Sequence, residues 1–263
     1  MRLDTHVHTE HTRRRVRGRL GHSVPACGTT AERAYATARA AGMDLVTLTD
    51  RDTIDGALRL AGLPGVVVGC EVTAVFPEDG VHVRLNVFGL DAPAHREIQR
   101  LRHDIRRLLP CLRALGLFTS LSHVARPVCG PFSAVHLLAL LPWMDAVETR
   151  NGALTAAQNR VAHSLAVAAG KPAIAGSDAY SARAIGRTWT EVPGATTAAE
   201  FFAGLRQGRG RVGGADAPQW PAQVLALGQG IWRLVREERH DTDLLVDLLS
   251  RPALARALLA DAA

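Results

Sequence analysis

Short apolar runs, each followed by a helical pattern, recur along the first 213 residues of the chain. This rhythm is typical of repeated strand–helix units, and most of the runs are too apolar for exposed hairpins. The sequence therefore predicts an α/β fold built around a parallel sheet. The seven predicted strands are residues 2–7, 44–49, 65–72, 81–88, 117–122, 145–149 and 172–176.

Start and stop signals mark the predicted helices between these strands. Gly42 and Gly170 stand where two helices should end. Residues 94–116 are expected to form one long basic amphipathic helix that Pro110 kinks or ends. Three capping-box patterns predict helix starts, namely Thr29-x-x-Glu32, Thr155-x-x-Gln158 and Thr197-x-x-Glu200.

The strand–helix rhythm stops after Gly213-Gly214, and the rest of the chain predicts two helices, residues 223–239 and 242–259. We therefore expect two parts, a main α/β domain over residues 1–213 and a helical extension over residues 214–263. The extension either packs on the first part or forms a dimer contact, and the oligomeric state is left open.

The composition excludes several classes of protein. The chain has no apolar stretch of 18 residues and no apolar segment behind a positive start, so we expect neither a membrane span nor secretion. The four cysteines lie far apart with no C-x-x-C pair, which argues against a disulfide framework and a cysteine zinc site. A reducing cytoplasm fits these features best.

Acids and imidazoles recur where the predicted strands end. In a closed parallel barrel the carboxyl ends of all strands meet on one face, and that face holds the active site. The sequence therefore predicts that residues distant along the chain converge there. The residues concerned are His6, His8, Asp50, Glu71, His123, Glu148 and Asp178.

His6 and His8 are the strongest candidates for metal ligands. They are two residues apart, so on an extended strand both side chains point to the same side. Asp4 precedes them on that face, and Glu71 lies in a buried strand. Neutral imidazoles with carboxylates suit zinc, manganese or iron, and Glu71 could bridge two ions.

Five ordered motifs within residues 1–213 resemble the PHP (polymerase and histidinol phosphatase) superfamily. The resemblance implies a distorted seven-stranded (β/α)7 TIM-like barrel with up to three divalent metal ions, which hydrolyses phosphate esters. The motifs are Asp4-Thr5-His6-Val7-His8-Thr9, Leu48-Thr49-Asp50-x-Asp52-Thr53, Gly69-Cys70-Glu71-Val72, Ser122-His123 and Gly176-Ser177-Asp178-Ala179.

The resemblance also implies a ligand set for two of the metal ions. The first ion would be held by His6, His8, Glu71 and Asp178. The second would share Glu71 and add His123 and a histidine from the fourth strand. His82 is the candidate for that last position, with Arg84 as the alternative.

The third implied metal site departs from the family pattern. Family members have histidines where this chain has Arg51 and Tyr180, which suggests a centre with one or two ions. A guanidinium is a fixed positive charge, so we hypothesise that Arg51 takes the region of the missing ion and holds the substrate phosphate. The alternative is that Arg51 pairs with a neighbouring aspartate.

Other residues complete the expected catalytic and substrate-binding set. Asp50 is expected to orient a ligand or accept a proton. Five arginines in a short stretch, including Arg13 and Arg15, form either a phosphate-binding loop or a solvated charged loop. Tyr180 and His22 are further candidates for substrate contacts.

The sequence therefore predicts a metal-dependent hydrolase of small phosphorylated substrates that uses one or two zinc, manganese or iron ions. One alternative is a catalytically weakened PHP barrel that binds a phosphorylated ligand or partner. A nuclease is the other alternative, favoured by the net charge of +6 but not by any aromatic stacking platform.

Overall fold

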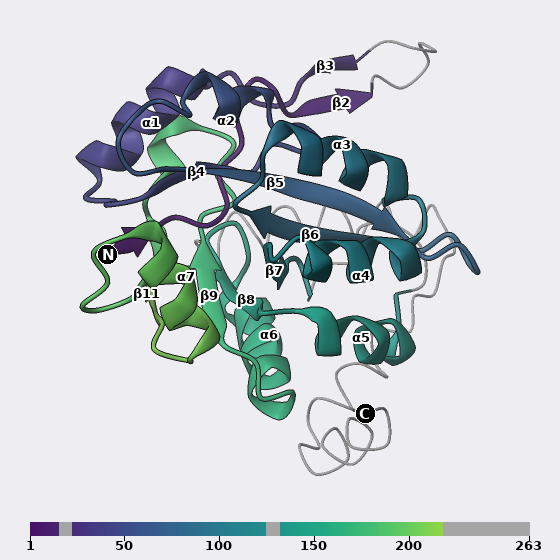
Figure 1. Ribbon diagram of the computed structural model, residues 1–263. Helices are drawn as coiled ribbons and strands as arrows, with labels where there is room; N and C mark the ends of the chain where they lie inside the picture. The colour runs from purple at the N-terminus through teal and green to yellow at the C-terminus, as the bar shows by residue number, and fades with distance from the viewer. Residues whose placement is uncertain (16–22, 125–131, 218–263) are drawn as a thin grey trace, which may run out of the picture.

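The computed structural model describes residues 1–15, 23–124 and 132–217 of the chain (Figure 1). Its main element is a six-stranded sheet that curls around the buried polar residues described below. Helices cover its outer side. The strands, in their order across the sheet, are β4 (Val46–Leu48), β5 (Val66–Val75), β6 (His82–Phe88), β7 (Phe118–Leu121), β8 (Ala146–Asn151) and β9 (Ala173–Gly176).

The sheet is mixed, so the predicted all-parallel arrangement is wrong at β6. This strand runs antiparallel to both β5 and β7, whereas the other neighbours in the sheet are parallel. The reason lies in the connection, because only residues 76–81 separate β5 from β6. A parallel crossover needs a dozen or more residues, whereas a hairpin needs only a few.

The first predicted strand, residues 2–7, is divided between two places. Its start, β1 (Arg2–Leu3), joins a separate antiparallel sheet with β10 (Thr188–Glu191) and β11 (Arg211–Gly214). Its end lies between the two edges of the main sheet, where Val7 forms a parallel bridge with Ala179. Thr49 donates its backbone N–H to the carbonyl of Val7 at 2.8 Å. A full seven-stranded barrel is therefore not confirmed.

Helices α3 (Ala92–Leu101) and α4 (Ile105–Ala114) lie along β5 and β6 (Figure 1). Their apolar faces join the largest core cluster through Ile98, Ile105 and Leu108. The structure thus replaces the single predicted helix 94–116 by two. The break has a local cause, because Asp104 caps a new helix by accepting a hydrogen bond from the backbone N–H of Arg106 at 3.1 Å. Pro110 lies inside α4 and does not end it.

The remaining helices follow the predicted pattern closely. Thr155 and Thr197 are N-caps as predicted, whereas the first cap is Thr30 and not Thr29. Gly42 and Gly170 follow two helix ends with φ angles of 81° and 61°, a conformation that glycine adopts without strain. These helices are α1 (Ala31–Ala40), α2 (Asp55–Arg59), α5 (Ala134–Leu140), α6 (Ala156–Ala168) and α7 (Ala198–Arg206).

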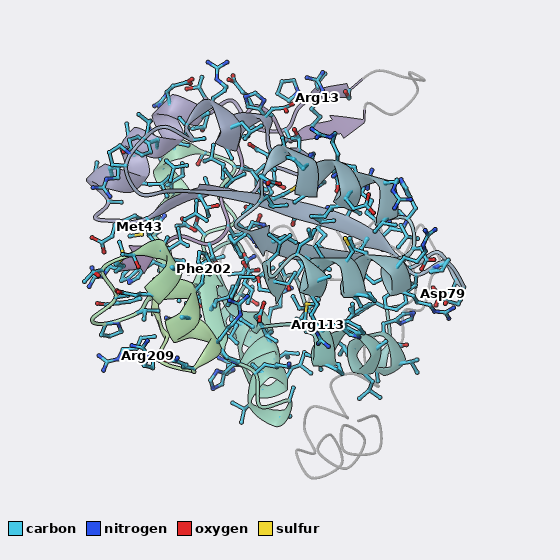
Figure 2. The ribbon with its side chains drawn as sticks, in the orientation of Figure 1. Arg13, Met43, Asp79, Arg113, Phe202 and Arg209 are labelled. Carbon is cyan, nitrogen blue, oxygen red and sulfur yellow. The ribbon has the colours of Figure 1, made fainter. Side chains whose placement is uncertain are left out.

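The start of the arginine-rich stretch forms a hairpin that the sequence did not predict. Strand β2 (Arg13–Arg15) pairs with β3 (Ser23–Pro25) and projects from the body of the molecule (Figures 1 and 2). The guanidinium of Arg13 donates to the hydroxyl and the carbonyl of Ser23 at 2.8 and 2.6 Å. These bonds stabilise the base of the hairpin.

The predicted helical extension lies outside the described residues beyond position 217, so the domain boundary at 213 stays a prediction. Strand β11 continues to Gly214, and Asp216 accepts a hydrogen bond from Asn159 at 2.8 Å. Within the described ranges, no helix has both the length and the apolar character needed to cross a membrane.

Candidate metal centre

Four elements bring the predicted ligands together at one side of the curled sheet. His6 and His8 lie on the segment between the sheet edges, and Glu71 lies in β5. His123 and Asp178 follow strands β7 and β9. All five are buried, with His6, His8 and Glu71 0% exposed.

Two overlapping groups of these side chains have the spacing of a metal site, namely His6, Glu71 and His123, and His6, His8 and Asp178. Asp178 Oδ1 lies 3.3 Å from His8 Nε2 and 3.6 Å from His6 Nε2. Glu71 Oε1 lies 3.0 Å from His123 Nε2 and 3.3 Å from His6 Nε2. The two carboxylates therefore stand on either side of His6.

Unpartnered polar atoms indicate that these residues fit a metal ion. His6 Nε2, His8 Nε2 and Asp178 Oδ1 are buried and make no hydrogen bond with any of the described residues. A buried polar atom without a partner is costly, and native structures rarely leave three together. Imidazole with carboxylate is the donor set that zinc, manganese and iron accept. The three atoms face one another, as the donors around a single cation would.

The backbone holds two of the ligands in a strained conformation. His123 and Asp178 have φ angles of 57° and 49°. This left-handed region costs energy for residues other than glycine and is enriched at functional sites. Each residue lies two positions after the end of a strand, where the chain turns.

A further set of buried side chains fixes the orientation of the two histidines. His6 Nδ1 lies 2.7 Å from Glu148 Oε1, and Asn151 donates to the other oxygen of Glu148 at 2.9 Å. His8 Nδ1 lies 3.0 Å from Thr12 Oγ1. With both Nδ1 atoms engaged, each ring presents Nε2 to the centre.

Asp50, expected to be a catalytic group, is engaged away from the ligands. Its carboxylate accepts hydrogen bonds from the N–H and hydroxyl of Thr9, both at 2.6 Å, and from the hydroxyl of Thr12 at 2.7 Å. Because Thr12 also contacts His8, hydrogen bonds connect Asp50 to His8 through Thr12. Thr9 and Thr12 were missed by sequence reasoning, although Thr9 directly follows the His6-Val7-His8 motif.

The carboxylates and histidines shift one another's pKa. Burial alone would raise the pKa of Glu71, but the hydrogen bond with His123 and the nearby His6 and His8 rings hold it well below its usual value. Burial would also raise the pKa of Asp178, but His6, His8 and His123 together lower it. Burial would lower the pKa of His6, yet Glu148 and Asp178 raise it well above its usual value. The centre is thus a set of ionised carboxylates that attracts a cation.

Arg51 and Tyr180, the two departures from the family pattern, meet at the edge of this centre. Arg51 donates through Nη2 to the Tyr180 hydroxyl at 2.7 Å and through Nε to Glu71 Oε2 at 3.2 Å. The Tyr180 ring packs on His8 with a centroid distance of 4.4 Å. Burial, with Glu71 and Asp178 nearby, raises the pKa of the Tyr180 hydroxyl.

Arg84, and not His82, reaches the centre from β6. Arg84 Nη1 lies 3.5 Å from Glu71 Oε1. Glu71 is opposite Asn86 in the β5–β6 ladder, whereas His82 is opposite Val75. His82 therefore lies about 13 Å along the strand from the level of Glu71. The structure thus brings Arg84, the alternative, to Glu71 and does not bring His82 there.

A cavity of about 520 Å³ adjoins the centre, and Arg51 is one of its walls. His11, Arg13 and Thr53 also line it, which brings the base of the β2–β3 hairpin beside Arg51. Arg15 is part of β2, and His22 lies outside the described residues. Of the predicted substrate contacts, the structure thus brings Arg13, Arg51 and Tyr180 to this side of the molecule.

The described chain is therefore an α/β protein with a buried histidine–carboxylate centre at one side of a curled sheet. Residues 156–209 match the model of the PHP-associated family. No protein of curated function matches the chain at the sequence level.

Several solved structures share its fold at low sequence identity. PsfC from Pseudomonas syringae is 19% identical with a TM-score of 0.57, over 89% of this chain and 98% of that one. An amidohydrolase from Chromobacterium violaceum, with bound sulfate and no metal, is 15% identical with a TM-score of 0.52, over 80% of this chain and 97% of that one.

A two-domain protein from Bacteroides vulgatus that contains a predicted PHP-like metal-dependent phosphoesterase is 15% identical with a TM-score of 0.60. The alignment covers 81% of this chain and 64% of that longer protein. The chain is thus similar to PHP-type proteins in its fold and, over residues 156–209, to the PHP-associated family.

Proposed function

We propose that this protein is a metal-dependent hydrolase that acts on phosphate esters. The observation that carries this proposal is a set of three buried atoms, His6 Nε2, His8 Nε2 and Asp178 Oδ1, beside the ionised Glu71. None of the three has a hydrogen-bond partner in the part of the chain that the structure describes. Two proteins of similar fold, one described as containing a predicted phosphoesterase and the other as an amidohydrolase, support hydrolysis as the reaction class.

His6, His8, Glu71 and Asp178 would hold a divalent ion in this centre. Such an ion supplies Lewis-acid polarisation of a phosphoryl oxygen and lowers the pKa of a water molecule. Glu148 and Thr12 keep the histidine rings oriented. Arg51 stands between Glu71 and the cavity, where its guanidinium is placed to attract an incoming phosphate.

The test is metal content per chain together with turnover of a panel of phosphate monoesters and diesters. We expect zinc, manganese or iron to copurify, and Asp178→Ala to lose both metal and turnover. Exposed Glu97→Gln is the control and should change neither. If the protein binds no metal after incubation with manganese or zinc, the hydrolase is wrong.

A catalytically weakened PHP barrel is the second candidate, favoured by the Arg51–Tyr180 contact at positions where the family has histidines. Such a protein would bind metal and phosphate yet hydrolyse none of the esters. The same panel therefore separates the two functions. A nuclease would instead cleave oligonucleotides with added metal and bind them in a salt-dependent manner.

A further inference from the structure

The two candidate ligand groups compete for one atom. Both include His6, whose Nδ1 lies 2.7 Å from Glu148, so Nε2 alone is left for a metal ion. A neutral imidazole nitrogen has a single lone pair and serves one cation. Filling the group with His8 and Asp178 therefore leaves a second ion with only Glu71 and His123 from the other group.

Two guanidinium groups stand where that second ion would need room. Arg51 Nε contacts Glu71 Oε2 at 3.2 Å, and Arg84 Nη1 contacts Glu71 Oε1 at 3.5 Å. Each oxygen of this fully buried carboxylate thus already has a fixed cation beside it. A second divalent ion on Glu71 would be repelled by both guanidinium groups and by the first ion, and it would have only His123 as a further ligand. The first ion has three further ligands, His6, His8 and Asp178, to offset the repulsion by the guanidinium groups.

The same guanidinium groups keep donors free for another ligand. Arg84 Nε is buried and makes no hydrogen bond within the described structure. Arg51 uses Nε and Nη2 for its two contacts, which leaves Nη1. The Tyr180 hydroxyl accepts from Arg51, so its own proton is available to donate. Arginine binds phosphate-like oxyanions through paired N–H groups.

The charge of the cluster also favours an anion once a single divalent ion is present. Glu71, Asp178 and Glu148 supply three negative charges. Arg51, Arg84 and one divalent ion supply four positive charges. With neutral histidines these five side chains and the ion sum to one positive charge. The adjoining cavity is lined by Arg13 and Arg51 and also by the carboxylates of Glu10, Asp52 and Asp55.

We propose that this centre holds one divalent ion, on His6, His8, Glu71 and Asp178, and that Arg51 and Arg84 form a clamp for a dianionic tetrahedral oxyanion such as a phosphate monoester. The clamp replaces further metal ions as the source of positive charge. It deepens the proposed function by naming the substrate class, and it is measurable without turnover.

The first measurement is metal stoichiometry by elemental mass spectrometry and zinc titration. We expect one zinc per chain in the wild type. Arg51→Gln and Arg84→Gln should also bind one zinc, because neither side chain is a ligand. Two or more tightly bound ions per wild-type chain would overturn the proposal.

The second measurement is calorimetric titration of the zinc-loaded protein with inorganic phosphate, after free zinc has been removed. Loss of a charge-assisted contact predicts that Arg51→Gln and Arg84→Gln each weaken phosphate affinity by about 10- to 100-fold. Arg100→Gln, which removes an exposed arginine from α3, should leave it unchanged.

Phosphate affinity that is unchanged in both glutamine variants would mean that the arginines only neutralise Glu71, which overturns the clamp. Arg84→Lys retains the positive charge if Arg84→Gln does not fold, and it should bind phosphate more weakly than the wild type. Arginine-dependent phosphate binding without ester hydrolysis supports the clamp while contradicting the hydrolase. Ester hydrolysis together with phosphate binding that does not depend on the two arginines would support the hydrolase and contradict the clamp.

Discussion

At the scale of single residues, the two ring nitrogens of His6 have different partners, and these partners set the orientation of the ring in the centre. Nδ1 lies against the carboxylate of Glu148, and Nε2 faces Glu71 and Asp178. His8 follows the same arrangement with Thr12 on its Nδ1 side. Each ring is thus fixed from behind by a buried hydrogen-bonding partner.

Glu148→Gln is expected to weaken zinc affinity by about 10- to 100-fold, because partners behind a ligand histidine fix its orientation and raise its basicity. Competition with a fluorescent chelator measures the change. Glu97→Gln makes the same substitution on exposed α3 and should have no effect. An unchanged affinity in Glu148→Gln would show that Glu148 only packs at the end of β8.

Thr12→Val removes the hydroxyl that links His8 to Asp50. We expect weaker zinc binding, about tenfold or more, because the His8 ring loses its partner. Thr73→Val is a matched control, since the Thr73 hydroxyl is buried and makes no hydrogen bond. If both variants bind zinc like the wild type, Asp50 has no orienting role through Thr12.

At the scale of elements, side-chain caps decide where helices begin. The start of α7 has a double contact in which the N–H and hydroxyl of Thr196 both donate to Glu200 at 2.8 Å. These hydrogen bonds lower the pKa of Glu200 below its usual value, and the bond from the backbone N–H of Thr196 has the larger effect. Stability from a lowered carboxylate pKa is fully present above pH 4.5 and is lost as the pH falls through the folded value.

The lowered pKa of Glu200 predicts how the stability of a Glu200→Gln variant changes with pH. Glutamine has the same shape without the charge, so the variant should melt below the wild type near pH 7. The difference should shrink as the pH falls and vanish once Glu200 is protonated. Thermal melting from pH 7 to pH 3 measures it. A difference that stays constant over this range would mean that the charge is not responsible.

At the scale of the whole molecule, the centre depends on how closely the amino-terminal segment approaches β9. Gly176 makes this approach possible, since a Cβ there would lie 2.5 Å from the Cβ of His6 and 2.6 Å from its backbone nitrogen. Residues far apart in sequence are in contact here. A methyl group added at position 176 would therefore disturb both the packing of the fold and the position of His6.

Gly176→Ala should therefore destabilise the fold by about 1–3 kcal/mol, the usual cost of overpacking, and weaken zinc affinity at the same time. Denaturant unfolding and chelator competition measure the two effects. Gly28→Ala is the control, because a Cβ at that position meets nothing within 4 Å. Loss of stability with unchanged zinc affinity would separate the packing contact from the centre.

The sequence determined most of what depends on local chemistry. Helix starts at Thr155 and Thr197 and ends before Gly42 and Gly170 follow from hydrogen bonds and backbone freedom within a few residues. The motifs that resemble the PHP superfamily also predicted five buried side chains that the fold brings together, namely His6, His8, Glu71, His123 and Asp178.

The tertiary structure decided what depends on register and on long-range contacts. Whether His82 or Arg84 reaches Glu71 depends on the pairing of β5 with β6, and a shift of two residues exchanges them. The contact of Arg51 with Tyr180 joins segments that are 129 positions apart. Local sequence patterns carry no information on such distances, because the positions of these side chains are set by packing of the whole sheet.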